Sequence, residues 1–367
     1  MKVLISTDTV GGVLTYTTEL AAALEAQGDE VVVATMGARL RREQRALLPA
    51  RVHESGYRLE WMEDPWDEVA TAGKWLLSLE EEEEPDVVHL CSYAHGGLPF
   101  RAPKVLVAHS CVLSWWRAVH GAEAPAPWDR YRAEMGAGLE GADAVVAPTR
   151  AMLGEIERDH ELRPGAAAVI HNGSAAPLAP ATAEKRELVL GSGRFWDPAK
   201  NLATLDAAAA GLAWPVKVAG DLGDGETRHV ESTGVLDPAA LTELRREAAI
   251  YAAPAIYEPF GLGILEAARD RCALVLGDIP SLRELWRDAA IFVDPRDELE
   301  LREVLEALIG DRYLRADLAE RAQRRGAEYS VARAARAYRR LYERLTERAR
   351  SSSRIAGKST FEEEARP

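Results

Sequence analysis

The chain has 367 residues, which predicts two domains, and its 47% hydrophobic and 28% charged residues are typical of a soluble globular protein. The formal net charge of −14 argues against a nucleic-acid-binding protein, because phosphate backbones attract basic surfaces. The three cysteines, Cys91, Cys111 and Cys272, lie far apart, which argues against a disulfide framework or a zinc site and favours a reducing compartment.

The first half of the chain alternates short apolar runs with segments of helical periodicity. An apolar run at residues 2–7 is followed by Gly11-Gly12, and apolar residues then recur at helical spacing up to Gly28. A second run at 31–34 completes the pattern of a βαβ unit. Further apolar runs, which predict buried strands of a parallel sheet, lie at 87–90, 105–108 and 144–147.

Residues 39–48, from Arg39 to Leu48, combine four arginines with three leucines in an amphipathic pattern. A solvated helix face explains this pattern, and contact with an anionic membrane surface is the functional alternative. The chain shows neither a signal-peptide core nor an apolar run near the ~20 residues of a membrane span. We therefore expect a cytoplasmic protein, with peripheral contact at the inner face of the membrane as the alternative for this stretch.

The second half of the chain repeats the alternation after a linker. Residues 173–187 contain Pro177, Pro180 and many alanines, which indicates a connecting segment. Residues 299–349 are predicted to be almost wholly helical, and the serine- and glutamate-rich tail to be disordered. Strands are predicted at 188–190, 216–219, 250–252, 274–276 and 291–293.

These patterns predict an α/β fold of two Rossmann-like domains that face a cleft. Open α/β sheets bind ligands at the carboxyl ends of their strands, so we expect the ligand site between the domains. The predicted division is an N-terminal domain at 1–178, a C-terminal domain at 187–330, a final helix at 331–349 that packs back on the first domain, and a disordered tail at 351–367.

The string Glu258-Pro-Phe-Gly-Leu-Gly-Ile-Leu-Glu266 carries the strongest chemical signal. Pro259 and Gly261 favour a turn after a strand, and the residues from Gly263 onward can open a helix. Free N–H groups at a helix start are well placed to hold a diphosphate, and a carboxylate can accept hydrogen bonds from two sugar hydroxyls. The bare spacing of two glutamates also fits an ordinary strand–turn–helix with surface carboxylates, but the full string favours a ligand site.

This string resembles the E-x7-E motif of family 4 glycosyltransferases, which are retaining enzymes of the GT-B fold. The segment Ser192–Phe195 with Lys200-Asn201-Leu202 is similar to that family's G-R-x…K-N element. The resemblance covers roughly residues 1 to 349. Other segments that agree with it are Gly11-Gly12, 85–89, 171–173, 234–237 and 279–284.

The resemblance implies a role for each matched residue. Arg194 and Lys200 would bind the donor diphosphate, Glu266 the ribose, and Glu258 the transferred sugar. The remaining positions would contact the donor as well: Gly11 and Gly12 by close approach of the first-domain loop, Leu236 at the nucleobase, and Phe260, Gly261 and Leu262 through their backbone. His109 falls where the family often has a histidine near the sugar, with a hydrogen-bonded strand-end histidine as the structural alternative.

Two tryptophans of the first domain, Trp115 and Trp116, are candidates for the acceptor site, because aromatic rings stack on sugars and other flat apolar faces. Plain packing is the alternative. No histidine or carboxylate spacing indicates a metal site, and we expect neither a metal nor a cofactor, since side-chain cations and helix ends can stabilise a diphosphate.

The resemblance implies transfer of a sugar, with retention, from a nucleotide-sugar donor to a hydroxyl acceptor. UDP-sugars are the most frequent donors in the family. Two alternatives stay open: a sugar-nucleotide epimerase of the same fold, and a non-catalytic GT-B scaffold. The motifs leave the acceptor and the oligomeric state open.

Overall fold

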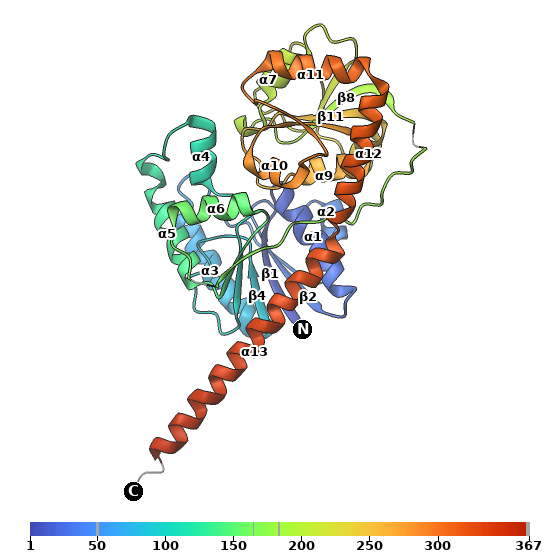
Figure 1. Cartoon of the computed structure of the whole chain (residues 1–367). Helices are drawn as coiled ribbons and strands as arrows, with labels where there is room; N and C mark the ends of the chain where they lie inside the picture. The colour runs from blue at the N-terminus through green and yellow to red at the C-terminus, as the bar shows by residue number, and fades with distance from the viewer. Residues whose placement is uncertain (49–50, 164, 183, 365–367) are drawn as a thin grey trace.

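The computed structural model describes residues 1–48, 51–163, 165–182 and 184–364, and for residues 352–364 only the backbone. Figure 1 shows two α/β domains, one above the other, joined by a linker on one side. Each domain contains one parallel sheet with helices on both faces. The predicted fold class is therefore confirmed.

The N-terminal sheet has seven strands in the order β3-β2-β1-β4-β5-β6-β7. The strands are β1 (Lys2–Asp8), β2 (Glu30–Met36), β3 (Val52–Glu54), β4 (Val87–Leu90), β5 (Lys104–Val107), β6 (Ala144–Ala147) and β7 (Ala167–Val169). The helices are α1 (Gly12–Glu25), α2 (Arg42–Leu47), α3 (Trp66–Glu83), α4 (Val112–His120), the 3₁₀ turn η1 (Ala126–Trp128), α5 (Asp129–Gly141) and α6 (Arg150–Asp159).

The C-terminal sheet has six strands in the order β10-β9-β8-β11-β12-β13. The strands are β8 (Arg186–Ser192), β9 (Val216–Ala219), β10 (Glu231–Gly234), β11 (Ala248–Ala253), β12 (Ala273–Gly277) and β13 (Ile291–Val293). The helical elements are η2 (Pro198–Lys200), α7 (Leu202–Ala209), α8 (Pro238–Glu247), α9 (Leu262–Arg269), α10 (Pro280–Trp286), α11 (Glu298–Gly310), α12 (Arg312–Glu328) and α13 (Val331–Glu364).

The strand order of each sheet reverses direction once. In the N-terminal sheet the reversal lies between β1 and β4, and in the C-terminal sheet it lies between β8 and β11. At such a point the loops leave neighbouring strands in opposite directions and open a crevice at the carboxyl ends of the strands. The loops that follow β1, β8 and β11 are therefore expected to hold the ligand.

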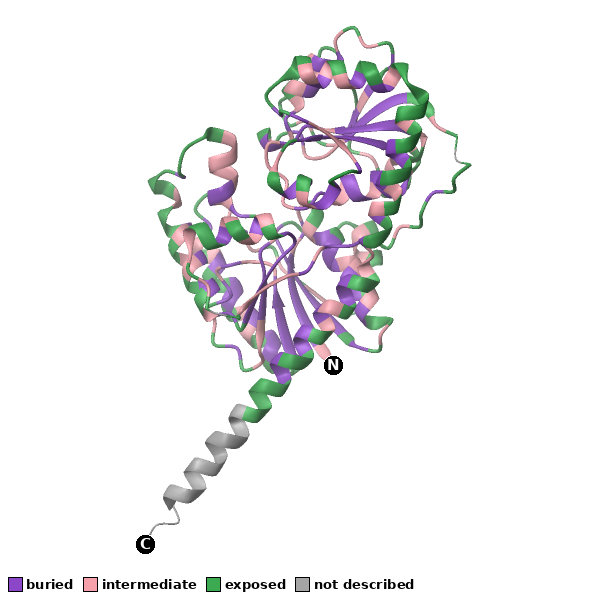
Figure 2. Ribbon diagram, viewed as in Figure 1, coloured by how far each residue is buried: buried purple, intermediate pink, exposed green. Residues whose placement is uncertain are grey.

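The helix α13 crosses from the C-terminal domain and lies against α1 of the N-terminal domain (Figure 1). Its apolar stripe, formed by Tyr338, Leu341, Tyr342 and Leu345, is buried there. Fully burying side chains of this size contributes roughly 1.5–3 kcal/mol each. Figure 2 shows this alternation of buried and exposed positions along the helix, which fastens the end of the chain to the first domain.

The tail differs from the expectation. We predicted disorder from residue 351, whereas the structure continues α13 as a helix to Glu364 and leaves only residues 365–367 outside its description. The serines and charges that indicated disorder are interspersed with alanine, lysine and glutamate, which favour helix, and α13 is already nucleated upstream.

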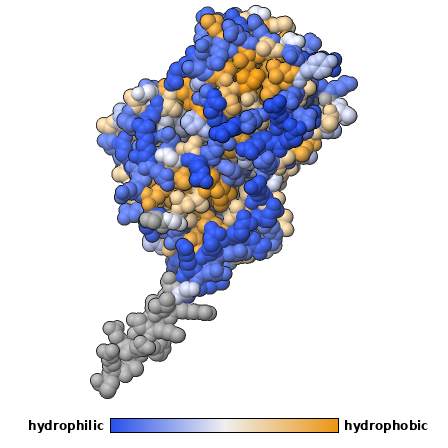
Figure 3. Space-filling model, viewed as in Figure 1, coloured by the Kyte–Doolittle hydropathy of each residue, from blue (hydrophilic) through white to orange (hydrophobic). Residues whose placement is uncertain are grey.

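The basic stretch at residues 39–48 includes the short helix α2. Leu40 and Leu48 pack against the N-terminal core, and Leu47 is 60% exposed. The stretch thus presents one of its three leucines to solvent, and its contact with a membrane stays a prediction. Among the described residues, no helix is long and apolar enough to cross a membrane. The face seen in Figure 3 is mainly hydrophilic, with apolar patches on both domains.

Candidate active site

The predicted phosphate-binding and sugar-binding residues lie in two adjacent loops of the C-terminal domain. One loop follows β8 and carries Arg194 and Lys200, and the other follows β11 and carries Glu258. Because β8 and β11 are neighbours at the reversal of the sheet, the two loops meet. A small cavity there is lined by residues of both loops, among them Ser192, Phe195, Lys200, Glu258 and Gly261.

Lys200 and Glu258 form an ion pair inside this cavity, with 2.6 Å between Nζ and Oε2. Lys200 ends the 3₁₀ turn η2, whose first residues are capped by Asp197: its Oδ1 accepts a hydrogen bond of 2.9 Å from the Ala199 N–H. Asn201 follows in a left-handed conformation, and its side-chain amide donates to the Pro254 carbonyl at 2.8 Å. The turn and the loop after β11 are thus tied together beside the ion pair.

Arg194 lies at the cleft, against the first-domain loop. An ideal Cβ placed on Gly11 would come within 2.8 Å of the Arg194 guanidinium, and Gly11 has φ +71°. Both the backbone conformation and the close approach therefore require glycine. Among the residues that the structure describes, Arg194 has no salt-bridge partner, although its guanidinium stacks over the Trp196 ring at 5.4 Å. Its charge is available to an anion.

The second glycine, Gly12, begins α1 and faces the start of α9. An added Cβ there would meet the Leu262 side chain at 3.8 Å, so the two domains touch at the N-termini of two helices. Gly261 precedes α9 with φ +83°, and Phe260 is buried in the C-terminal core. The first turn of α9 leaves backbone N–H groups for a ligand, which suits the role predicted for residues 260–262.

Glu266 lies on α9 and is held by Arg245, a residue that the sequence analysis missed. The Arg245 guanidinium donates to Glu266 Oε2 at 2.9 Å and to Asp270 Oδ2 at 2.6 Å. Burial raises the pKa of Glu266, and the Arg245 charge opposes that rise. No local pattern distinguishes Arg245 from the other arginines of its helix, because the contact joins α8 to α9 through space.

Leu236 lies in the loop between β10 and α8, as the resemblance requires for a position at the nucleobase. Its side chain packs at the edge of the C-terminal core, and Val235 beside it is 65% exposed. Asp237 ends the loop by capping α8, because its Oδ1 accepts the Ala239 and Ala240 N–H groups at 2.9 Å. The loop thus offers a ligand its backbone groups and the exposed apolar side chain of Val235.

His109 follows β5 on the N-terminal side of the cleft. Its Nε2 lies 3.3 Å from the Cys91 sulfur, and the Tyr16 ring approaches it edge-on at 4.5 Å between centroids. Burial lowers the pKa of His109 to about 3, so the imidazole is neutral at physiological pH. A ring of such low basicity in a close-packed setting suits an orienting role better than that of a proton acceptor.

Asp8, at the end of β1, is a further carboxyl group that the sequence analysis did not single out. Its Oδ1 accepts a hydrogen bond of 2.9 Å from the Val10 N–H. Burial raises the pKa of Asp8 to about 6, while that hydrogen bond and the charge of Arg194 oppose the rise. A carboxylate near the arginine of the other domain adds an electrostatic contact across the cleft.

The two candidate acceptor residues have protein partners. Trp115 donates from Nε1 to Asp197 Oδ1 at 2.9 Å, across the cleft. Trp116 packs within the N-terminal domain, with its ring centroid 4.3 Å from that of His120 and 6.3 Å from that of Trp128. The interdomain bond of Trp115 was not foreseen, since it joins residues that are 82 positions apart.

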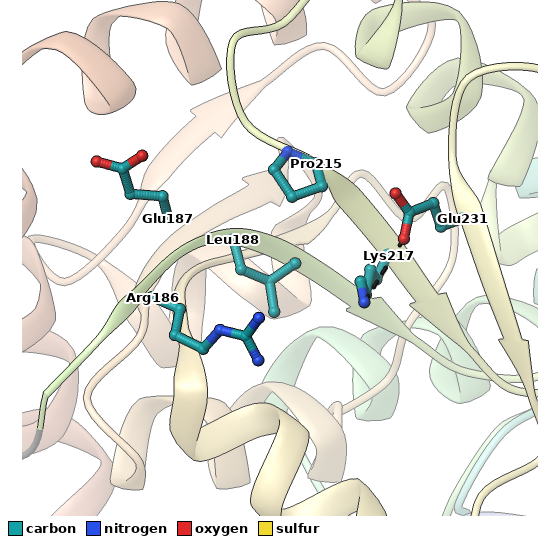
Figure 4. Close-up of a pocket in the computed structure, with 6 residues that line it drawn as sticks. All are labelled: Arg186, Glu187, Leu188, Pro215, Lys217 and Glu231. Atoms are coloured by element: carbon teal, nitrogen blue, oxygen red, sulfur yellow. Dashed lines mark ion pairs between the residues drawn. The ribbon is translucent and has the colours of Figure 1, made fainter.

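A larger hollow lies in the same domain, at the amino ends of the strands and thus opposite the small cavity (Figure 4). It is lined by the first residues of β8, by Pro215, by Lys217 of β9 and by Glu231 of β10, and Lys217 already pairs with Glu231 at 3.5 Å. The amino ends of parallel strands lack the crevice that the carboxyl ends form. We therefore place the site at the smaller cavity.

One group of side chains in the described residues has the spacing of a metal site: His53, Glu82 and Glu83. The Glu83 carboxylate is already engaged by Arg51 at 2.7 Å and by His53 at 2.8 Å. The group lies near the amino end of β1, where Lys2 also contacts Glu83. It is remote from the cleft, and metal-independent catalysis stays a prediction.

Comparisons with known proteins agree with this geometry. The family model described as Glycosyltransferase Family 4 matches residues 10–174, and the model described as Glycosyl transferases group 1 matches residues 224–325. A comparison with curated proteins finds no match.

Solved structures share the fold at low sequence identity. Sucrose-phosphate synthase from Thermosynechococcus elongatus has 17% identity and a TM-score of 0.75, over 94% of this chain and 99% of that chain. Anabaena HepE in complex with UDP-glucose has 17% identity and a TM-score of 0.73, over 94% and 100%. A glycosyltransferase from Rickettsia africae has 16% identity and a TM-score of 0.69, over 94% and 98%. With a family model on each domain and the same two-domain architecture, the chain belongs to the family 4 glycosyltransferases of the GT-B fold.

Proposed function

We propose that this glycosyltransferase moves a sugar, with retention of anomeric configuration, from a UDP-sugar to a hydroxyl acceptor. The observation that carries the proposal is a pair of cations in the segment that follows β8. Arg194 lies against Gly11 at the cleft and has no salt-bridge partner among the described residues, and Lys200 lines the small cavity, where it is paired with Glu258. The similarity to a structure in complex with UDP-glucose supports the choice of donor.

The two cations would act on the leaving group. Negative charge grows on the donor diphosphate as the glycosidic bond breaks, so a fixed cation stabilises the transition state more than the ground state. The Arg194 guanidinium can bind two phosphate oxygens at once, and the Lys200 ammonium has two N–H groups beyond the one directed at Glu258. The diphosphate would lie between them, beside the first turn of α9.

The carboxylates would bind the hydroxyl groups of the donor. Glu258 keeps one oxygen for the transferred sugar while the other faces Lys200, and Glu266 is positioned for the ribose by Arg245. Because the lowered pKa makes His109 a weak base, we assign the acceptor proton to the leaving phosphate oxygen, with attack from the face that this oxygen vacates. The new bond then has the configuration of the old one.

Turnover with purified protein tests the proposal. UDP-, GDP-, ADP- and dTDP-sugars are screened first by thermal shift, because a ligand that binds only the folded state raises stability by RT ln(1 + [L]/Kd). The matching donor is then incubated with candidate acceptors, and the product anomer is assigned by NMR. We expect consumption that requires an acceptor, a retained anomer, and activity that survives EDTA. Acceptor-independent conversion of the donor would instead indicate an epimerase.

A further inference from the structure

The helix α4 of the N-terminal domain is held to the C-terminal domain along its whole length. At its start, the Cys111 N–H donates to the Tyr257 hydroxyl at 3.0 Å, and Ser114 Oγ lies 2.9 Å from the same oxygen. In its middle, Trp115 donates to Asp197. At its end, the Arg296 guanidinium donates to the Ala118 carbonyl at 2.9 Å.

The first two contacts reach the immediate neighbours of the ion pair in the candidate active site. Tyr257 directly precedes Glu258, and its ring packs in the core of the N-terminal domain although its backbone belongs to the other domain. Asp197 caps the turn that ends at Lys200, and the oxygen that accepts from Trp115 also accepts from the Ala199 N–H. One helix thus contacts the segments that carry both members of the pair.

The helix is also fixed rigidly within its own domain. Leu113 is buried in the core beneath α4, and the side chain of Arg117 is 10% exposed. The Arg117 guanidinium bonds to Glu155 and Asp159 of α6 at 2.9 Å. A change in the angle between the domains would therefore move the bonding partners of Tyr257 and Asp197 as one body.

We propose that α4 positions Lys200 and Glu258 across the cleft, so that Trp115 and Tyr257 are positioning residues whose hydrogen bonds couple domain closure to assembly of the ion pair. This inference rests on the proposed function for its catalytic consequence, but the coupling itself is a property of the protein without substrate. It also gives Trp115 a role other than stacking on the acceptor.

The test uses Trp115→Phe and Tyr257→Phe, which keep an aromatic ring at each position and remove the hydrogen bonds of the Trp115 Nε1 and of the Tyr257 hydroxyl. The controls are Trp128→Phe and Tyr342→Phe. The Trp128 ring packs within the N-terminal domain, and the Tyr342 hydroxyl bonds to His89 of the same domain at 2.6 Å. Each protein is measured in two ways: kcat and donor KM, and the distance between nitroxide labels at exposed Glu140 and Glu306, on α5 and α11, by double electron–electron resonance without ligand.

We expect each cleft variant to lower kcat about fivefold, the effect of one net hydrogen bond, while donor KM changes less than twofold. The label distances should broaden toward longer values in both variants and stay narrow in both controls. Unchanged distances, or a loss of kcat that the controls reproduce, would overturn the inference. If no nucleotide sugar is turned over at all, the proposed function fails, and the label distances still decide whether α4 holds the domains together.

Discussion

The two sides of the cleft have the same architecture but different chemistry. On the C-terminal side, the loops that follow the central strands carry Arg194, Lys200 and Glu258. On the N-terminal side, the corresponding loops carry two glycines and the neutral His109. The C-terminal side therefore presents cations and a glutamate to the cleft, whereas the facing side contributes close approach together with the buried carboxyl group of Asp8. Substitutions on each side of the cleft test this difference.

Removing a donor-side cation should have the largest effect. Arg194→Ala or Lys200→Ala should lower kcat about a hundredfold, by analogy with the loss of one preorganised electrostatic donor. Arg194→Ala should lower the melting temperature without donor only slightly, because Arg194 has no salt bridge among the described residues beside its stacking on Trp196 and the nearby Asp8. Lys217→Ala is the control, since this lysine forms a similar ion pair at the opposite edge of the same sheet. If Lys217→Ala lost as much kcat as Lys200→Ala, the cavity would be wrongly assigned.

Adding one carbon to the N-terminal side should have a smaller, steric effect. Gly11→Ala strains a backbone with φ +71° and pushes a Cβ against Arg194, so we expect kcat/KM for the donor to fall about tenfold or more. Gly28→Ala imposes similar backbone strain at φ +87°, with no atom within 4 Å of the new Cβ. It should cost stability but not activity. Equal kinetics for the two variants would mean that contact with Arg194 is irrelevant.

The contact of Arg245 with Glu266 should appear in the pH dependence of donor binding. Burial already raises the pKa of Glu266, and Arg245→Met would raise it further by removing the opposing charge. Ribose binding needs the carboxylate, so donor affinity should fall as the pH falls, and at a higher pH in this variant than in the wild type. Arg246→Met, whose arginine contacts Asp270 but not Glu266, is the control. Donor Kd values measured by calorimetry from about pH 5 to pH 8 provide the comparison, and coincident pH profiles for all three proteins would contradict this role.

Substitution of the neutral His109 should have the smallest effect. The plot of kcat against pH should show no inflection that comes from this histidine. Because its pKa is lowered to about 3, its protonation state is constant over the working range, and no inflection of kcat near pH 6.5 should come from it. His109→Gln keeps a neutral polar side chain and should retain the shape of the wild-type pH–kcat curve. An inflection that is present in the wild type and lost in this variant would make His109 a titrating base.

The sequence predicts the central strands and the motif-bearing segments on the C-terminal side of the cleft well, because their signals are local. The string 258–266 and the 192–202 segment each span one strand-to-helix connection and the start of the helix that follows it, and the central strands are buried apolar runs. The strands that were missed are β3, β7 and β10, all short and all at a sheet edge. Glu231 and Ser232 of β10 are exposed and polar, so this strand lacks the apolar run that marks a buried strand, whereas β7 is apolar but only three residues long, Ala167–Val169.

Contacts between distant residues could not be predicted in this way. Arg245 with Glu266, Trp115 with Asp197, and the Tyr257 hydroxyl with Cys111 all depend on the packing of separate elements. A single sequence records which residues are polar, but not which polar groups meet after folding. Trp115 is an example: its residue type indicated a stacking surface, which stays a prediction, whereas its hydrogen bond to Asp197 across the cleft depends on the folded arrangement.

The location of the donor is the central claim, and hydrogen–deuterium exchange with and without UDP tests it most directly. Bound nucleotide should slow exchange in peptides that cover residues 193–201, 234–237 and 258–266, because their N–H groups lie at the small cavity and its adjoining loops. Exchange around 186–188 and 215–217, at the larger hollow of Figure 4, should not change. Protection at the larger hollow, or no protection after β8 and β11, would contradict the account.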